Sequence, residues 1–246
     1  MLAGHGWLAY VSCGVPRDVT LAIETSNPSG VAEQSVAKPG VALLRAGEVL
    51  GVEAIATGNA QHDDLMRAID SLCRRCGVTP REIARVVVSM GPGGFTNVRI
   101  AVTCARMIAE VTGAQLVGVP TAMVVAAGTA RANGACAVAL ASKGETAHVT
   151  VIDASGAMVS AGVMDAGQLA KLAIVAVIAD SHLPSAMRDV AMSKGWAIVH
   201  PVFDAVACAR VSEGLDASEP ARLTPIYPRE PEAVTKWRAM HAGKKL

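Results

Sequence analysis

The chain has 246 residues, of which 52% are hydrophobic and 17% are charged, and its formal net charge is +1. This composition supports a full hydrophobic core and excludes intrinsic disorder, and a nearly neutral chain has no overall electrostatic attraction to nucleic acid. No apolar run is long enough to span a bilayer, and the N-terminus lacks the basic residues of a signal peptide. We therefore expect a soluble, cytoplasmic protein that does not contact a membrane.

The first half of the chain alternates between two hydrophobic patterns. Continuous β-branched runs indicate buried strands, and apolar stripes at helical spacing indicate amphipathic helices. The predicted strands lie at 19–24, 41–44, 49–55, 86–90 and 116–119, and the predicted helices at 62–76 and 97–112. Residues 1–18 show little periodicity, and we interpret them as an N-terminal extension that is either disordered or precedes the true start codon.

The second half repeats this alternation with a higher alanine content. The predicted strands lie at 135–141, 146–153, 158–163 and 174–179, and the predicted helices at 121–131, 184–194 and 202–213. Two successive sets of strands and helices indicate two α/β lobes of similar build, with the boundary near Pro120. We assign residues 19–120 to an N-terminal lobe, 121–218 to a C-terminal lobe, and 219–246 to a tail rich in proline and charge.

A glycine-rich loop at residues 91–94 connects the predicted strand at 86–90 to the predicted helix at 97–112. Thr96 is the expected N-cap of this helix, since its hydroxyl can accept a hydrogen bond from a first-turn amide. Backbone amides at such a loop can bind an anion, but no Gly-Lys-Ser/Thr follows, and a tight turn for close packing explains the glycines more simply. The candidate anion- or nucleotide-binding residues are Thr25, Ser26, Gly91, Gly93, Gly94 and Thr96.

The predicted helix at 97–112 is apolar on nearly all sides, so its own sheet can cover only one of its faces. Exposed apolar surface of this kind marks an interface, which the helix at 62–76 could share in a four-helix arrangement around a two-fold axis. Burial of the helix beneath the second lobe is the alternative. The candidate interface residues are Leu65, Ile69, Leu72, Val98, Val102 and Met107.

The sequence identifies no catalytic residue and no metal site. Cys73 and Cys76 form a single CxxC pair without a second pair or nearby histidines, so we interpret the cysteines as small hydrophobic residues in a reducing compartment. His62 is alone in its predicted helix, so no second histidine lies on the same helical face to share a metal ion with it. No nucleophile has an identifiable base.

Several segments, taken in order along the chain, together resemble one family. Ile23-Glu24-Thr25-Ser26, followed by a hairpin, resembles the first phosphate loop of the actin/sugar-kinase/Hsp70 (ASKHA) superfamily. The other segments are Gln61-His62, Gly91-Pro92-Gly93-Gly94-Phe95-Thr96-Asn97-Val98-Arg99, Val117-Gly118-Val119-Pro120-Thr121 and the stretch from Pro225 to Ala233. Together they make residues 19–237 resemble the TsaB (YeaZ) family.

This resemblance implies an α/β, two-lobed ribonuclease-H-like (ASKHA) fold. It also implies a non-catalytic role, as the dimerisation subunit of the bacterial machinery that places threonylcarbamoyl on adenosine 37 of tRNAs reading ANN codons. The implied partners are a TsaD-like catalytic subunit and a TsaE-like ATPase, with tRNA engaged indirectly and a homodimer formed when the chain is alone. No cofactor of the chain itself is implied with certainty, although ATP or ADP could lie at an interface of the complex.

The sequence departs from the family pattern at several places, including the glycine loop at 94–99 and a longer connection from Asn27 to Gly40. Glu24 stands where the family usually has Asp, and the segment at 140–147 lacks the acid and both arginines usual there. These departures leave two other functions open. One is an enzyme of the ASKHA fold, either a small-molecule kinase or a hydrolase, and the other is a homodimeric paralogue with a drifted function.

Overall fold

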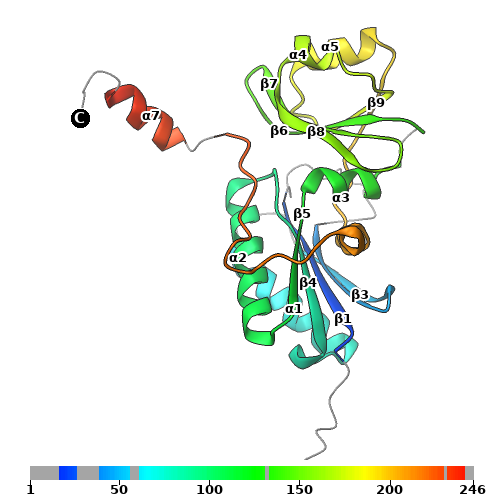
Figure 1. The fold of residues 1–246 in the computed structure, drawn as a ribbon, viewed down its shortest axis with the longest axis vertical. Helices are drawn as coiled ribbons and strands as arrows, with labels where there is room; N and C mark the ends of the chain where they lie inside the picture. The colour runs from blue at the N-terminus through cyan, green and yellow to red at the C-terminus, as the bar shows by residue number, and fades with distance from the viewer. Residues whose placement is uncertain (1–16, 27–38, 56–60, 131–132, 230–231, 242–246) are drawn as a thin grey trace, which may run out of the picture.

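The computed structural model of the chain describes residues 17–26, 39–55, 61–130, 133–229 and 232–241. Within these ranges the chain forms two lobes, each built on a five-stranded sheet, which lie end to end along the long axis of the molecule (Figure 1). Among the described residues, no helix is long and apolar enough to cross a membrane.

The first sheet has the strand order β3-β2-β1-β4-β5. Its strands are β1 (Val19–Glu24), β2 (Gly40–Arg45), β3 (Glu48–Ala54), β4 (Ile83–Ser89) and β5 (Gln115–Val119). The strands β1, β4 and β5 are parallel, while β2 and β3 extend the sheet as an antiparallel hairpin. The sequences of the parallel strands β1 and β4 are mostly apolar, because other parts of the chain cover both faces of these strands.

The second sheet has the order β10-β9-β6-β7-β8. Followed from its β8 edge, this sheet has its strands in the same chain order as the first sheet followed from β3. Its strands are β6 (Cys136–Lys143), β7 (Thr146–Ile152), β8 (Met158–Met164), β9 (Ala176–Ala179) and β10 (Ala197–Val199). Again an antiparallel hairpin joins one side of the first strand and parallel strands join the other. The expectation of two α/β lobes of similar build is therefore confirmed.

The helices cover both faces of each sheet. They are α1 (Gln61–Cys76), α2 (Phe95–Thr112), α3 (Thr121–Gly128), α4 (Ala166–Leu169), α5 (Ser185–Ser193), α6 (Ala205–Val211) and α7 (Glu232–His241). In the first lobe, α1 and α2 lie on one face of the sheet and α6 on the other. In the second, α4 and α5 cover one face, while α3 fills the space between the lobes (Figure 1).

The chain crosses between the lobes more than once. It leaves β5 at Pro120 and enters α3, close to the expected boundary. Helix α6 lies within the range 121–218 that the sequence assigns to the second lobe, yet it packs on β1 and β2 of the first sheet. The reason is its run of small buried side chains, including Ala205 and Cys208, which fit closely against Ala22 and Ala42.

The range 219–246 was expected to be a separate tail, but its first part is packed on the body. The backbone of Ser218 bridges Leu116, Leu223 is buried in the core of the first lobe, and the Ile226 amide donates to the Met90 carbonyl at 2.7 Å. Residues 218–229, which we call the strap, thus run along the first lobe. The strands and helices that the sequence did not predict are β10, α4 and α7.

The N-terminal extension was assigned to residues 1–18, of which residues 1–16 lie outside the described part of the chain. The Arg17 guanidinium donates hydrogen bonds to the carbonyl oxygens of Ile83 and Thr112 at 3.1 and 2.7 Å. The extension is therefore anchored to the first lobe at its C-terminal end.

Candidate functional site

The glycine loop packs directly against the turn that follows β1. The Gly94 amide donates to the Ser26 carbonyl oxygen at 2.7 Å, and a Cβ placed on Gly93 would lie 2.3 Å from that same oxygen. At the other end of the loop, the Thr121 amide donates to the Gly91 carbonyl at 2.9 Å. The loop glycines therefore permit close backbone contact, and the Gly94 amide is already paired within the chain.

Thr96 does not cap α2, which corrects the expectation from the sequence. The helix begins at Phe95, and the extended residue before it is Gly94, which has no side chain to accept a hydrogen bond. Thr96 therefore already has helical backbone and lies exposed in the first turn. A cap residue must precede the helix, so this hydroxyl cannot serve as one. Thr25 is half-buried beside the loop.

Glu24, at the end of β1, is fully buried, and its environment was not foreseen. Its Oε1 accepts hydrogen bonds from the Ser26 amide and hydroxyl at 2.8 and 2.6 Å, while its Oε2 has no hydrogen-bond partner among the described residues. Burial raises the pKa of the Glu24 carboxyl, and the like charge of Asp204 adds to this effect against the lowering by Ser26. Nearby, the hydroxyls of Ser89 and Thr121 are 2.7 Å apart.

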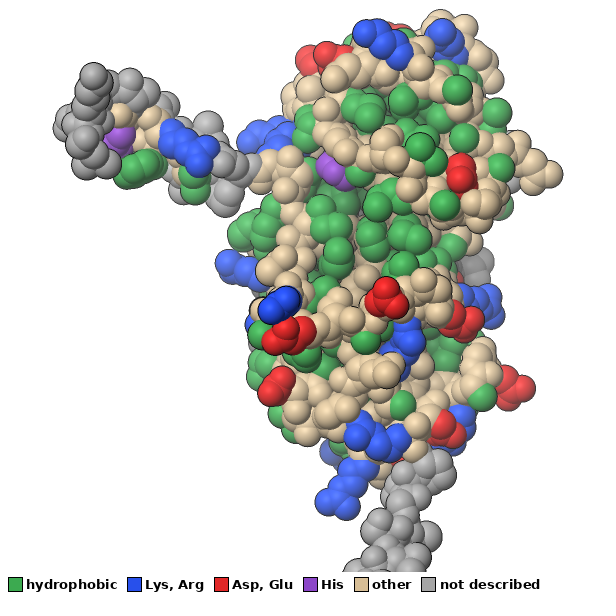
Figure 2. Space-filling model, viewed as in Figure 1, with side chains coloured by type: hydrophobic (Ala, Val, Ile, Leu, Met, Phe, Trp, Pro, Cys, Tyr) green, Lys and Arg blue, Asp and Glu red, His purple; other side chains and the backbone are tan. Residues whose placement is uncertain are grey.

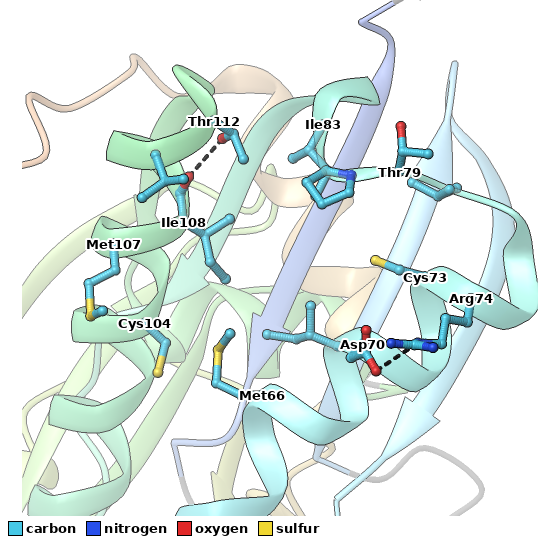
Figure 3. A pocket seen from close by; sticks show the side chains of 14 residues that line it. Met66, Asp70, Cys73, Arg74, Thr79, Ile83, Cys104, Met107, Ile108 and Thr112 are labelled. Atoms are coloured by element: carbon cyan, nitrogen blue, oxygen red, sulfur yellow. Dashed lines mark hydrogen bonds and ion pairs between the residues drawn. The ribbon is translucent and has the colours of Figure 1, made fainter.

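A second feature is an apolar groove between α1 and α2, on the face of the first lobe away from α6. It encloses about 590 Å³ and is closed at one end by the turn at 78–83 (Figure 3). Met66 from α1 and Met107 and Val111 from α2 are 52%, 62% and 87% exposed. The groove residues are Met66, Ile69, Asp70, Cys73, Arg74, Val78, Thr79, Pro80, Ile83, Cys104, Met107, Ile108, Val111 and Thr112.

Charge at the groove is confined to its rim. Asp70 and Arg74 form an ion pair of 2.8 Å one helical turn apart on α1. Burial raises the pKa of the thiols of Cys73 and Cys104, so both stay protonated at neutral pH and act as apolar wall atoms. The groove thus offers apolar contact rather than acid–base chemistry.

The structure buries most of the predicted interface residues in the core, and of the six only Ile69 and Met107 line the groove. Five of the six are less than 7% exposed, and only Met107 lies on the surface; the buried ones are Leu65, Ile69, Leu72, Val98 and Val102. A strong apolar stripe faces the helix's own sheet, and this is the stripe that the prediction selected. The neighbouring stripe of Cys104, Met107, Ile108 and Val111, at i, i+3, i+4 and i+7, was the signal for the groove.

The described residues hold no group of three or more His, Cys, Asp or Glu side chains placed to bind a metal ion. The described histidines with placed side chains lie apart: His148 is on β7, His182 and His200 are in loops, and His241 ends α7. The side chain of His62 lies outside the described part of the structure. None of the described cysteines forms a disulfide.

Comparisons with known proteins agree with the resemblance in the sequence. A family model described as "TsaD: tRNA N6-adenosine threonylcarbamoyltransferase" matches residues 55–195. A curated relative, the tRNA threonylcarbamoyladenosine biosynthesis protein TsaB of Bacillus subtilis (strain 168), is 38% identical over 90 residues. The matched segment spans 36% of this chain and about a third (35%) of the length of that relative.

Two solved structures share the fold. YeaZ from Pseudomonas aeruginosa superposes with a TM-score of 0.62 at 17% identity, over 85% of this chain and 99% of that one. A protein with similarity to peptidase YEAZ from the same organism gives a TM-score of 0.60 at 19% identity, over 86% and 100%. The ribonuclease-H-like (ASKHA) fold is confirmed. Since the family model covers more than half of its residues, the chain belongs to the family which that model describes.

Proposed function

We propose that this chain is a non-catalytic subunit of the machinery that makes threonylcarbamoyladenosine at position 37 of tRNA. In this role it binds a TsaD-like catalytic subunit through the α1–α2 groove. The pathway is supported by the family model and the Bacillus subtilis relative, which are both named for threonylcarbamoyl modification of tRNA. The groove is the observation that supports a binding role rather than a catalytic one.

The groove has the properties of a protein interface. Its walls are faces of α1 and α2 with exposed Met66, Met107 and Val111, and methionine adapts its shape to a partner surface. Exposed apolar surface of this extent is costly in water and marks an interaction site. A pair of apolar helices from a partner would complete a four-helix arrangement over the groove. In this proposal the same surface joins two copies of the chain when the catalytic subunit is absent.

Two features of the described residues favour a role without catalysis. The Gly94 amide is occupied by the Ser26 carbonyl and Glu24 is fully buried, so neither is open to a phosphate or a substrate as a kinase of this fold would need. Among the described residues, no two histidines lie on one face of a helix, which is the arrangement that a metal centre of the TsaD type would use. ATP or ADP at an interface with a TsaE-like ATPase, and a cytoplasmic location, are parts of this proposal.

The test is to co-express the chain with the TsaD-like protein of the same organism and to size the complex by light scattering. We expect a stable heterodimer. Met107→Glu places a charge in the groove wall and should weaken heterodimer formation at least ten-fold without changing the melting temperature. Met192→Glu, on α5 of the other lobe, makes the same substitution at a 68% exposed site and should leave the affinity unchanged.

Two results would contradict this proposal. One is a chain that stays a monomer or homodimer in the presence of the TsaD-like protein. The other is a Met107→Glu variant that binds as tightly as the unchanged chain. ATP turnover by the isolated chain that is lost in Thr25→Ala would favour an enzyme instead.

A further inference from the structure

The outer strands of the two sheets, β3, β5, β8 and β10, differ in how their edges are protected. The edge of an outer strand presents unpaired backbone amides and carbonyls to other chains, and proteins block it with charged side chains, with a covering segment or with a very short strand. In the first sheet the strap covers β5, where the Ser218 amide donates to the Leu116 carbonyl at 2.7 Å. In the second sheet, β10 has only three residues.

The outer strand β3 is protected by charge and by helix α1. Two glutamates lie in the strand itself. The Arg75 guanidinium of α1 donates to the Val52 carbonyl at 2.9 Å, and the Cys76 thiol donates to the Leu50 carbonyl at 3.5 Å. Side chains of α1 therefore occupy part of the polar backbone of β3.

Among the described residues, strand β8 has no comparable protection. It is seven residues long, carries no charged side chain, and no described strand or strap lies beyond it in the sheet. Val159 and Val163 are 64% and 38% exposed, and a Cβ on Gly162 would have no atom within 4 Å. The register with β7 shifts at Val159, so this bulge is confined to one end and residues 160–164 pair regularly. Figure 2 shows hydrophobic and uncharged surface across the middle of the second lobe.

The sequence of β8 is nearly unchanged when it is reversed about Ala161. From residue 158 to residue 164 it is Met-Val-Ser-Ala-Gly-Val-Met. In an antiparallel pair of strands, residues that lie opposite one another share a face of the sheet. A second copy of β8, related by a two-fold axis at Ala161, would place Met opposite Met, Val opposite Val and Ser160 opposite Gly162. Small side chains would then meet at the centre and apolar side chains at both ends.

We infer that β8 pairs antiparallel with β8 of a second copy of this chain, about a two-fold axis at Ala161. The pairing supplies hydrogen-bond partners to the edge amides and carbonyls of both copies, and it joins two five-stranded sheets into one continuous sheet. The contact closes at two copies, because each copy uses its β8 edge once. This surface is on the second lobe and the α1–α2 groove is on the first, so the inference goes beyond the proposed function and does not depend on it.

The test measures self-association of the full chain by sedimentation equilibrium, with Met107→Glu in every sample to suppress contacts through the groove. Two double variants that differ only at residue 162 are compared. Ser160→Lys/Gly162→Glu places lysine opposite glutamate across the two-fold axis, whereas Ser160→Lys/Gly162→Lys places lysine opposite lysine. We expect the dimer dissociation constant of the second variant to exceed that of the first by about ten-fold or more, and the difference to shrink at high salt concentration.

The Met107→Glu chain without further change should form a dimer, and hydrogen exchange in residues 158–164 should slow as its concentration rises. A chain that stays monomeric, with exchange in β8 independent of concentration, would overturn the inference. So would equal dissociation constants for the two double variants, because residues 160 and 162 would then not face each other across the contact. Both variants should melt as the Met107→Glu chain does, since Ser160 is exposed and the space beside Gly162 is open. All samples share the groove substitution, so a failure of the proposed function leaves this comparison intact.

Discussion

The Gly94 amide donates a 2.7 Å hydrogen bond to the carbonyl oxygen of Ser26, and this contact joins the loops that follow two neighbouring parallel strands. In open α/β sheets, ligands bind at the carboxyl ends of such strands. Here the chain itself occupies that position, since the turn after β1 lies against the glycine loop after β4. The contact therefore accounts for the loop glycines by packing.

Gly93→Ala should destabilise the protein by about 1–3 kcal/mol, because the added Cβ would lie 2.3 Å from the Ser26 oxygen and the backbone would have to move. The free energy of unfolding in urea measures this effect. Gly162→Ala is the matched control, since no atom lies within 4 Å of a Cβ at that position in β8. Equal stability of the two variants would mean that the two loops are not in close contact.

Glu24→Gln should make the protein more stable at neutral pH, by about 1 kcal/mol or more. The pKa of Glu24 is raised in the folded state by burial, so the folded state holds its proton more tightly than the unfolded state, whose pKa is near 4.5. Protonation of Glu24 therefore makes its full contribution to the free energy of unfolding below pH 4.5. That contribution is lost as the pH rises through the pKa of Glu24 in the folded state. Glutamine keeps the shape and carries no charge to bury.

The check is the difference in melting temperature between variant and unchanged chain at pH 4 and pH 7.5. We expect a larger difference at pH 7.5, and Glu110→Gln, at an exposed site on α2, should show none at either pH. A Glu24→Gln variant that is less stable than the unchanged chain at pH 7.5 would contradict this prediction. The favourable interactions of the Glu24 carboxylate would then outweigh the cost of burying its charge.

The sequence predicted the strands of both sheets well and the path of the chain between the lobes poorly. Strands such as β1 and β4 are continuous apolar runs that end at glycine or polar residues, which is a local signal. The packing of α6 on the first sheet is not local, because alanines at 205, 207 and 209 fit either lobe equally well. The short strand β10 has only three residues and follows a helix too closely to show a pattern.

The α1–α2 groove lies between the two helices for which the sequence predicted an interface, but most of the residues named for that interface are buried in the core. Periodicity identified the stripe with Val98 and Val102, which faces the sheet. The groove wall is the stripe beside it, and only the packing of α1 beside α2 decides which stripe remains open. The electrostatic surroundings of Glu24 could not be foreseen either, since Asp204, whose like charge adds to the rise of its pKa, caps the distant helix α6.

His148 should make stability fall as the pH drops below about 6.5. Burial lowers the pKa of this imidazole in the folded state, and the nearby Arg229 guanidinium lowers it further. The unfolded state therefore takes up a proton first as the pH falls through its ordinary value of 6.5, and folding loses stability from there downward. Thermal melts between pH 5 and 8 should show this loss, and His148→Gln should flatten the profile over that range.

Arg229→Met should loosen the strap from the second lobe while both lobes stay folded. The substitution removes the hydrogen bonds to Ala141 and Thr146 and keeps most of the aliphatic stem, at a cost of about 1–3 kcal/mol. Hydrogen exchange should rise in residues 218–229 and at Thr146. Arg222→Met is the control, since Arg222 is 84% exposed and pairs only with Glu219 three residues before it. Unchanged exchange in the strap would contradict the role of Arg229.

Val102→Asp should prevent folding, whereas Val111→Asp should give a folded protein that no longer binds its partner. Both residues lie on α2 and the substitution is the same, but Val102 is 2% exposed and Val111 is 87% exposed. A carboxylate at 102 would be buried among apolar side chains without a partner, at a cost of about 4 kcal/mol or more. Circular dichroism reports the fold and light scattering with the TsaD-like protein reports binding. A folded Val102→Asp variant would contradict the placement of that side chain in the core, and a Val111→Asp variant that binds normally would remove the C-terminal end of α2 from the docking surface.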